Sequence, residues 1–131
     1  MIRISDYTII NLVEVDDSAG DNAANVQAHF ARKHLNSEHL GLSHFRYGPG
    51  FRPKNGHSHR EQEEIYVVVN GSGRIKLNDD IVELRKWDTV RVAPATVRAL
   101  EGGPDGLEFL AIGTDRPEGG DGLQTEGFWE D

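Results

Sequence analysis

The stretch that decides the fold is residues 50–73, GFRPKNGHSHREQEEIYVVVNGSG. It places two histidines, His57 and His59, two residues apart, and a run of carboxylates that ends at Glu64 follows them. An apolar segment rich in β-branched residues comes next and ends in a glycine turn, a pattern typical of a buried strand that leads into a tight bend. Imidazole nitrogens and a carboxylate oxygen on adjoining strands are ligands that divalent transition metals bind.

Size and composition limit the class of protein. The chain of 131 residues is long enough for one domain with a hydrophobic core and short for two. Its formal net charge of −8 argues against a general nucleic-acid surface, and the absence of cysteine excludes disulfides and thiolate metal sites. Residues 1–17 do not resemble a signal peptide, and no later run is as long as a membrane span. We therefore expect a soluble cytoplasmic protein that binds neither nucleic acid nor membranes.

Glycine and proline clusters divide the chain into short segments. Fifteen glycines and five prolines are spread over many turns, which favours short strands and an all-β sandwich or barrel. Residues 26–42 are ambiguous, because they fit either a short helix or an arm that lies over another element. The expected strands are residues 8–15, 42–47, 65–70, 74–77, 81–84, 89–92, 97–100 and 107–112.

These segments predict one domain over residues 1–131. We expect a barrel core at about residues 42–112, an N-terminal arm over residues 1–41 and a tail over residues 113–131. The tail is rich in Gly, Asp and Glu, and we expect it to be mobile unless Phe128 and Trp129 dock it onto the barrel.

The opening stretch resembles the first signature motif of the cupin superfamily. That motif reads a glycine, a His-x-His pair, three or four residues, a glutamate, six residues and a glycine. Gly50, His57, His59, Glu64 and Gly71 supply it, with the leading glycine one residue further from the first histidine than usual. The resemblance implies an all-β, double-stranded β-helix, which is the cupin or jelly-roll barrel.

The second cupin signature motif is degenerate in this chain. It reads a glycine, five residues, Pro-x-Gly, two residues and a histidine that serves as the fourth metal ligand. Trp87 stands at the glycine position, residues 93–95 read Ala-Pro-Ala, and Arg98 occupies the histidine position. We expect Trp87 to be a packing residue at this corner. Together the two motifs cover roughly residues 42–112.

The resemblance leaves two hypotheses for the site. In the first, His57, His59 and Glu64 bind a divalent metal, because two imidazoles and one carboxylate are the ligand set of non-haem iron enzymes. Arg98 cannot be a ligand and would clamp an anionic group of the substrate. In the second, Arg98 pairs with Glu64, its guanidinium takes the place of the cation, and the barrel holds no metal, since like charges repel strongly in a desolvated pocket.

Side-chain alternation along residues 64–69 predicts an inner and an outer face. Tyr66 and Val68 share the parity of Glu64 and should face the interior. There, Tyr66 either offers its hydroxyl to a ligand or is a core aromatic whose hydroxyl is already bonded. An outward apolar stripe needs a cover, and the resemblance implies that a second copy supplies it in a homodimer. The stripe consists of Ile65, Val67 and Val69.

Two functions stay open at this point. One is a small metal-dependent cupin enzyme of the dioxygenase, isomerase or lyase kind, with Fe, Mn, Ni or Zn as Lewis acid or oxygen binder and a small anionic substrate. The other is a metal-free binding module that recognises a small anionic or sugar-like ligand without catalysis. A fold that hosts many chemistries does not identify the reaction.

Overall fold

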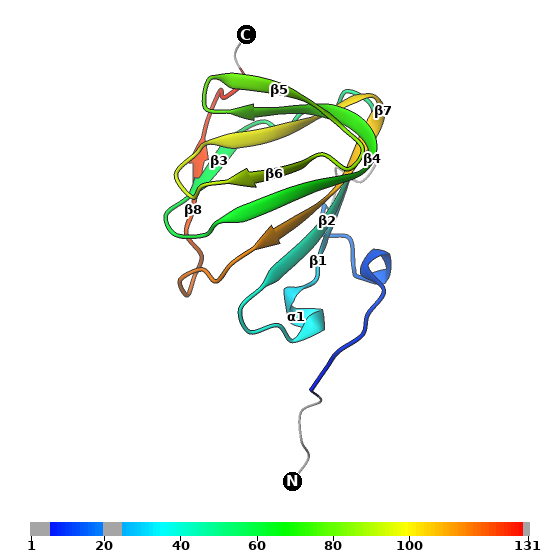
Figure 1. Cartoon of the computed structure of the whole chain (residues 1–131), viewed down its shortest axis with the longest axis vertical. Helices are drawn as coiled ribbons and strands as arrows, with labels where there is room; N and C mark the ends of the chain where they lie inside the picture. Colours follow the sequence, from blue (N-terminus) through cyan, green and yellow to red (C-terminus); the bar gives the residue numbers. More distant parts are fainter. Residues whose placement is uncertain (1–5, 20–24, 130–131) are drawn as a thin grey trace.

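The computed structural model describes residues 6–19 and 25–129 and consists mainly of one curled antiparallel sheet (Figure 1). The strands and helices, in chain order, are η1 (Leu12–Glu14), β1 (Val26–Phe30), α1 (Arg32–Leu35), β2 (Gly41–Tyr47), β3 (Gly56–His59), β4 (Glu64–Leu77), β5 (Asp80–Arg85), β6 (Thr89–Val92), β7 (Arg98–Gly113) and β8 (Gly122–Thr125). The prediction of an all-β barrel is therefore confirmed.

Two long strands, β4 and β7, form the centre of the sheet. They pair along most of their length, and the register shifts between Val68 and Asn70 and again between Gly71 and Gly73. Gly71 has a φ of 75°, which a residue with a Cβ rarely adopts, so the bend falls where glycine permits it. The expected pairs of strands at residues 65–70 and 74–77, and at 97–100 and 107–112, are each one continuous bent strand.

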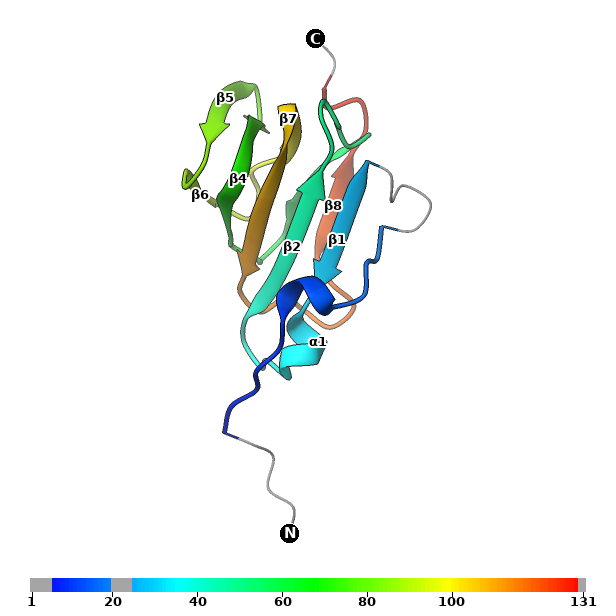
Figure 2. The same cartoon turned by 90° about the vertical axis from the view of Figure 1, so that its right-hand side faces the viewer.

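The bends let the sheet curl around a core. β1 and β2 extend the sheet on one side of β7, β4 carries β5 and β6 on the other, and β3 and β8 pair with each other (Figure 2). Tyr66, Val68 and Phe109 are among the buried residues of the core, whereas Ile65 is 36% exposed on the outer face. The predicted alternation of inner and outer residues along β4 is confirmed.

The N-terminal part of the chain differs from the prediction. The strand expected at residues 8–15 is wrong, because residues 12–14 form the short helix η1, capped by the Asn11 side chain. β-branched residues favour a strand only where a partner strand is available, and β2 pairs with β1 instead. The ambiguous residues 26–42 contain both a strand, β1, and one turn of helix, α1.

Trp87 is also placed differently from the prediction. It lies in the turn between β5 and β6 with a φ of 74°, and it is 66% exposed, with the Lys86 ammonium 5.7 Å from its ring centroid. This backbone conformation is the one that the glycine of the motif would adopt freely, and it directs the indole to solvent. The expectation of a packing residue is therefore wrong.

The C-terminal segment is part of the sheet. β8 pairs with β3 through all four of its residues, from Gly56 opposite Thr125 to His59 opposite Gly122. Beyond it, Phe128 and Trp129 are buried, and the Arg52 guanidinium lies 4.5 Å from the Trp129 ring centroid. Of the two alternatives given for the tail, the structure has the one in which Phe128 and Trp129 dock it onto the barrel. Among the described residues, no helix has the length and hydrophobicity needed to cross a membrane.

A glycine on β3 tests this docking. A Cβ added at Gly56 would lie 2.5 Å from Cδ2 of Phe128, so we expect Gly56→Ala to displace the ring and to lower the free energy of unfolding by about 1–3 kcal/mol. Gly122 on the paired strand β8 is the matched control, because a Cβ there meets no atom within 4 Å. Urea unfolding of both variants measures the difference. Equal stabilities would contradict the packing of Phe128 on β3.

Candidate metal centre and adjoining cavity

Three strands bring the predicted site residues together. His57 and His59 lie on β3 with one residue between them, so they share a face of the strand. β4 begins at Glu64, and β7 begins at Arg98, which is directly opposite His57 in the sheet. Residues that are up to 41 positions apart in sequence therefore meet at one end of the barrel.

Arg98 is completely buried, and every nitrogen of its guanidinium is engaged. Nη2 donates to Glu64 Oε1 at 2.9 Å, and Nε donates to the Tyr66 hydroxyl at 3.2 Å. Nη1 donates to the carbonyl oxygens of Pro94 at 3.1 Å and Thr96 at 2.8 Å. The ion pair of the second hypothesis is thus present, and the side chain is held from four directions.

Glu64 is the acceptor on which these groups converge. Oε1 accepts from the Tyr66 hydroxyl at 2.9 Å as well as from Arg98, and Nε2 of His57 and of His59 lie 3.5 and 3.2 Å from it. Burial alone would raise the pKa of Glu64, but hydrogen bonds from His57 and Tyr66 and the charge of Arg98 outweigh it and hold the pKa at about 2. No described residue hydrogen-bonds to Oε2.

The orientation of His59 is set by Asp121, a buried residue just before β8. Asp121 Oδ1 accepts from Nδ1 of His59 at 2.8 Å, and Oδ2 accepts from the backbone N–H groups of Glu61 and Gln62. Burial raises the pKa of Asp121, but these bonds outweigh it and hold the pKa at about 2. Because an ionised carboxylate only accepts, Nδ1 of His59 carries the proton, and in the neutral ring Nε2 carries the lone pair.

The three expected ligands fit a divalent metal. One ligand atom from each of His57, His59 and Glu64 can be chosen so that all lie within 4.8 Å of one another. Nε2 of His59 is buried and has no hydrogen-bond partner, and it faces Glu64 across a gap that a cation or a proton must bridge. A carboxylate that holds the other ring nitrogen of a histidine is the usual outer partner of a metal-binding imidazole.

A cavity of about 800 Å³ opens beside this centre. His57, His59, Glu64 and Tyr66 line its polar end, whereas Arg98 does not reach it. The walls are largely apolar, and this size and lining are typical of a small-molecule site. Aromatic and aliphatic side chains of these walls include Leu42, Phe45, Tyr47, Leu100 and Phe109.

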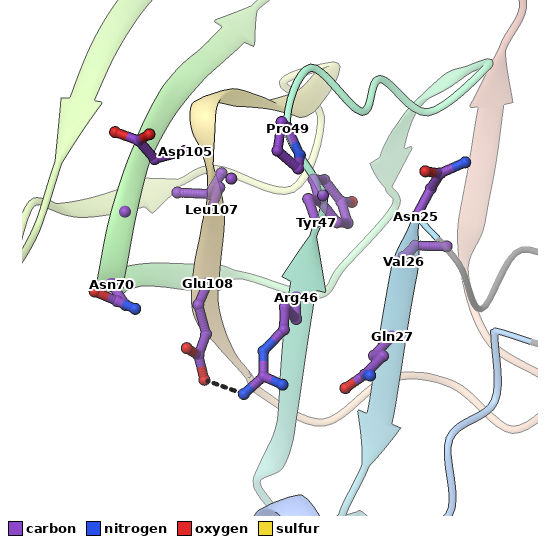
Figure 3. A pocket seen from close by; sticks show the side chains of 13 residues that line it. Asn25, Val26, Gln27, Arg46, Tyr47, Pro49, Asn70, Asp105, Leu107 and Glu108 are labelled. Atoms are coloured by element: carbon purple, nitrogen blue, oxygen red, sulfur yellow. Dashed lines mark hydrogen bonds and ion pairs between the residues drawn. The ribbon is translucent and has the colours of Figure 1, made fainter.

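A second hollow of about 260 Å³ lies on the outer face, over β1, β2 and β7 (Figure 3). Its charged lining includes Arg46, whose Nη2 lies 3.5 Å from Oε2 of Glu108, and this carboxylate also accepts from His44 Nε2 at 2.6 Å. Arg46 and Glu108 are already paired within the fold, and the remaining charged residue of the lining is the carboxylate Asp105, so this hollow offers less to an anionic ligand than the cavity does.

The sequence motifs and alternation pointed to the two histidines, Glu64, Tyr66 and Arg98, which the structure brings together, but gave no sign of Asp121. It lies in a Gly-rich segment without alternation, and its short strand β8 gave no hydrophobic signal. The basic residues that line the cavity from α1 and from the segment after β7 were also missed, since only the fold brings them near the histidines.

Comparisons with known proteins found similar solved structures but no matching protein-family model. An uncharacterized protein of Methanocaldococcus jannaschii is 36% identical over 45 residues, which span 34% of this chain and only 36% of that protein.

Three solved structures are similar over most of the chain. A cupin protein from Bacteroides fragilis has a TM-score of 0.72 and 22% identity, with 86% of each chain covered. A variant of Bacillus subtilis oxalate decarboxylase has a TM-score of 0.76 and 19% identity over 95% of this chain but only 33% of that chain. KdgF from Halomonas sp. has a TM-score of 0.68 and 15% identity, covering 86% of this chain and 97% of that one.

The geometry around Asp121 predicts a tautomer switch. In Asp121→Asn, the amide oxygen should keep the two backbone N–H groups, and its NH2 should then face His59 Nδ1. We expect the proton of His59 to move from Nδ1 to Nε2, as measured by long-range ¹H–¹⁵N correlation spectra. His29 is the internal control, because its Nδ1–H is donated to the carbonyl of Val15 and should not change. A folded variant in which His59 keeps its proton on Nδ1 would contradict this role of Asp121.

Proposed function

We propose that this chain, which has the cupin fold that those structural likenesses show, binds a divalent transition metal and a small anionic ligand. His57, His59 and Glu64 would hold the metal, and the adjoining cavity would hold the ligand. The chemistry would be of the dioxygenase, isomerase or lyase type, with Fe, Mn, Ni or Zn as the ion. The observation that carries the proposal is the buried, unbonded Nε2 of His59 beside the Glu64 carboxylate.

The donor set explains why a metal suits this place. A neutral imidazole whose Nδ1–H is held by a carboxylate presents Nε2 as a donor, and Glu64 Oε2 is free of hydrogen bonds from the described residues. When bound, the ion supplies Lewis-acid or oxygen-binding chemistry. Asp121 keeps the His59 ring in place, and Arg98 and Tyr66 hold the Glu64 carboxylate through its other oxygen.

The anionic character of the ligand has support beyond the metal. A divalent ion beside the buried guanidinium of Arg98 would give the polar end of the cavity an excess of positive charge over the single Glu64 carboxylate. A negatively charged ligand offsets that excess. One structural neighbour is an oxalate decarboxylase, and oxalate is a small carboxylate.

The alternative is a metal-free binding module, and the Arg98–Glu64 ion pair favours it. A guanidinium 2.9 Å from Glu64 Oε1 already neutralises the carboxylate that a metal would need. A protonated His59 could then donate to Glu64 Oε1 at 3.2 Å, which would satisfy the nitrogen that is otherwise unbonded. The barrel would recognise a small anionic or sugar-like ligand without turnover.

We further propose that the outer face of the sheet pairs two copies of the chain. Ile65 on β4 is opposite Ile112 on β7, which is in turn opposite Leu42 on β2, so apolar side chains cross three neighbouring strands. All three are at least partly exposed; Ile65 and Ile112 do not line the cavity, whereas Leu42 also contributes to its lining. A continuous apolar row of this kind favours a cover, and a second copy supplies one with the same surface.

Metal analysis separates the two functions. We expect protein purified without a His tag to carry, or to take up, one divalent ion per chain, measured by elemental analysis and titration. His57→Ala and Glu64→Gln should each weaken binding by more than the roughly 10- to 100-fold that loss of an outer partner causes. Glu64→Gln is preferred to alanine, because its amide oxygen keeps a hydrogen-bond acceptor for the buried Arg98 guanidinium, which alanine would not.

Two further variants complete this test. His39→Ala removes an exposed histidine outside the cavity and should leave metal binding unchanged. Arg98→His places an imidazole opposite His57, completes a four-ligand set and should raise metal affinity. Failure of the wild-type protein to bind any divalent ion would leave the metal-free module as the function.

The paired outer faces are tested by oligomeric state. Sedimentation velocity at micromolar concentration should show a dimer for the wild-type protein and a monomer for Ile65→Glu, since a buried carboxylate at the interface is strongly unfavourable. Val82→Glu is the matched control, because Val82 is an exposed apolar residue on β5, away from this row. A monomeric wild-type protein would rule out the proposed pairing.

A further inference from the structure

The cavity beside the proposed metal centre carries a charge opposite to that of the whole chain. The protein has 22 acidic and 14 basic residues, and its net charge is −8. Among the described residues that line the cavity, the only carboxylate is Glu64, and Arg98 already pairs with it. Besides His57 and His59, the basic residues that line the cavity are Arg32, Lys33, His34 and Arg116. This separation of charge produces a local positive potential in an acidic protein.

These cations come from two segments that only the fold brings together. Arg32, Lys33 and His34 belong to α1, which lies next to β2 (Figure 1), and Arg116 lies in the segment between β7 and β8. Arg32 links the two segments, because its Nη2 donates to the carbonyl of Thr114 at 3.1 Å.

The position of Arg32 depends on a glycine. A Cβ added at Gly41, at the start of β2, would lie 2.9 Å from Nη2 of Arg32, so the guanidinium occupies space that only a glycine leaves open. Asp115 is a distant partner, at 3.9 Å from Nη1, and its other oxygen accepts from His39. Arg32 is therefore held in place while its charge is only weakly compensated.

Lys33 and Arg116 carry uncompensated charge. Both are exposed, and neither makes an ion pair with any residue in the described ranges 6–19 and 25–129. Cations that line a cavity without partners are available to a ligand, and a negatively charged group there would gain two or three favourable contacts.

The middle of the cavity is apolar and aromatic. Phe45 and Phe109 stack with centroids 5.0 Å apart, and Tyr47 meets Phe109 edge-on at 5.2 Å. Burial raises the pKa of Tyr47, so its hydroxyl stays neutral. Such walls bind an apolar body, ring-shaped or chain-like, and supply few of the hydrogen bonds that the hydroxyl groups of a sugar need.

From the basic lining and the aromatic walls we propose that the ligand of this cavity is an organic anion, a carboxylate or phosphate joined to an apolar group. The apolar group lies against Phe45 and Phe109, and Lys33, Arg116 and Arg32 hold the negative charge. This ligand class deepens the proposed function, since it names what the same cavity takes. It does not require the metal, because the anion contacts side chains of α1 and of the segment after β7.

Titration calorimetry with a series of ω-phenylalkanoates of increasing chain length tests this class. The matching primary amides have the same apolar body without the charge, and phenylalkyl phosphates distinguish phosphate from carboxylate as the preferred head group. We expect at least one acid or phosphate to bind, and its neutral counterpart to bind about tenfold more weakly.

Two double variants locate the charge. Lys33→Gln with Arg116→Gln should weaken binding of the best anion about five- to tenfold and leave the neutral amide unaffected. Arg85→Gln with Lys86→Gln is the matched control, because it removes the same two residue types from exposed positions on and after β5, outside the cavity lining. We expect this control to bind the anion as the wild-type protein does.

The titrations are repeated on chelator-treated protein, so that metal binding and anion binding are judged separately. Anion binding that survives chelation and falls in the Lys33/Arg116 variant supports the proposal, whatever the metal analysis shows. Binding that disappears with the metal, returns with Zn²⁺ alone and is unchanged in that variant would overturn it, because the metal would then hold the anion. Equal binding of acid and amide, or no binding of any anion at millimolar concentration, would overturn it as well.

Discussion

The buried ion pair between Glu64 and Arg98 is the interaction around which this end of the barrel is arranged. Two charged groups removed from water are tolerated only where further hydrogen bonds satisfy the N–H groups and lone pairs that the ion pair itself does not use. Arg98 meets that requirement through Tyr66 and two backbone carbonyls, and Glu64 through Tyr66 and the nearby imidazoles. The pair joins the first residue of β4 to the first residue of β7. Removing one partner of such a buried pair typically destabilises a protein by about 3–5 kcal/mol.

The same pair governs what the centre can bind. It engages Oε1 of Glu64, from which Nε2 of His59 and of His57 lie 3.2 and 3.5 Å, and it leaves Oε2 without a hydrogen bond from the described residues. The Arg98 guanidinium is also a fixed positive charge beside the candidate metal site. It would weaken the affinity for a metal ion and strengthen the affinity for an anion. A divalent ion and an anionic ligand would consequently favour each other's binding in this cavity, since each compensates the charge of the other.

Segments from outside the central strands complete the site. Asp121, next to β8, holds the His59 ring, and the pairing of β8 with β3 keeps it there. α1 and the residues after β7 supply the basic side chains of the cavity. The arm and the tail that flank the predicted barrel core thus contribute Asp121 and the basic side chains that line the cavity.

The resemblance to the two cupin motifs indicated the fold class and the candidate residues His57, His59, Glu64 and Arg98. Side-chain alternation indicated the inner face of β4 and Tyr66 on it, because alternation is a local property of the chain. The continuous bends of β4 and β7 and the absence of the strand expected at residues 8–15 depended on which segments pair in the sheet. The exposure of Trp87 follows from its positive φ in the turn between β5 and β6. Asp121 and the cations of the cavity were decided only by the tertiary structure. Residues 62 positions apart, such as His59 and Asp121, carry no common periodicity, and only the closure of the sheet brings their side chains within hydrogen-bonding distance.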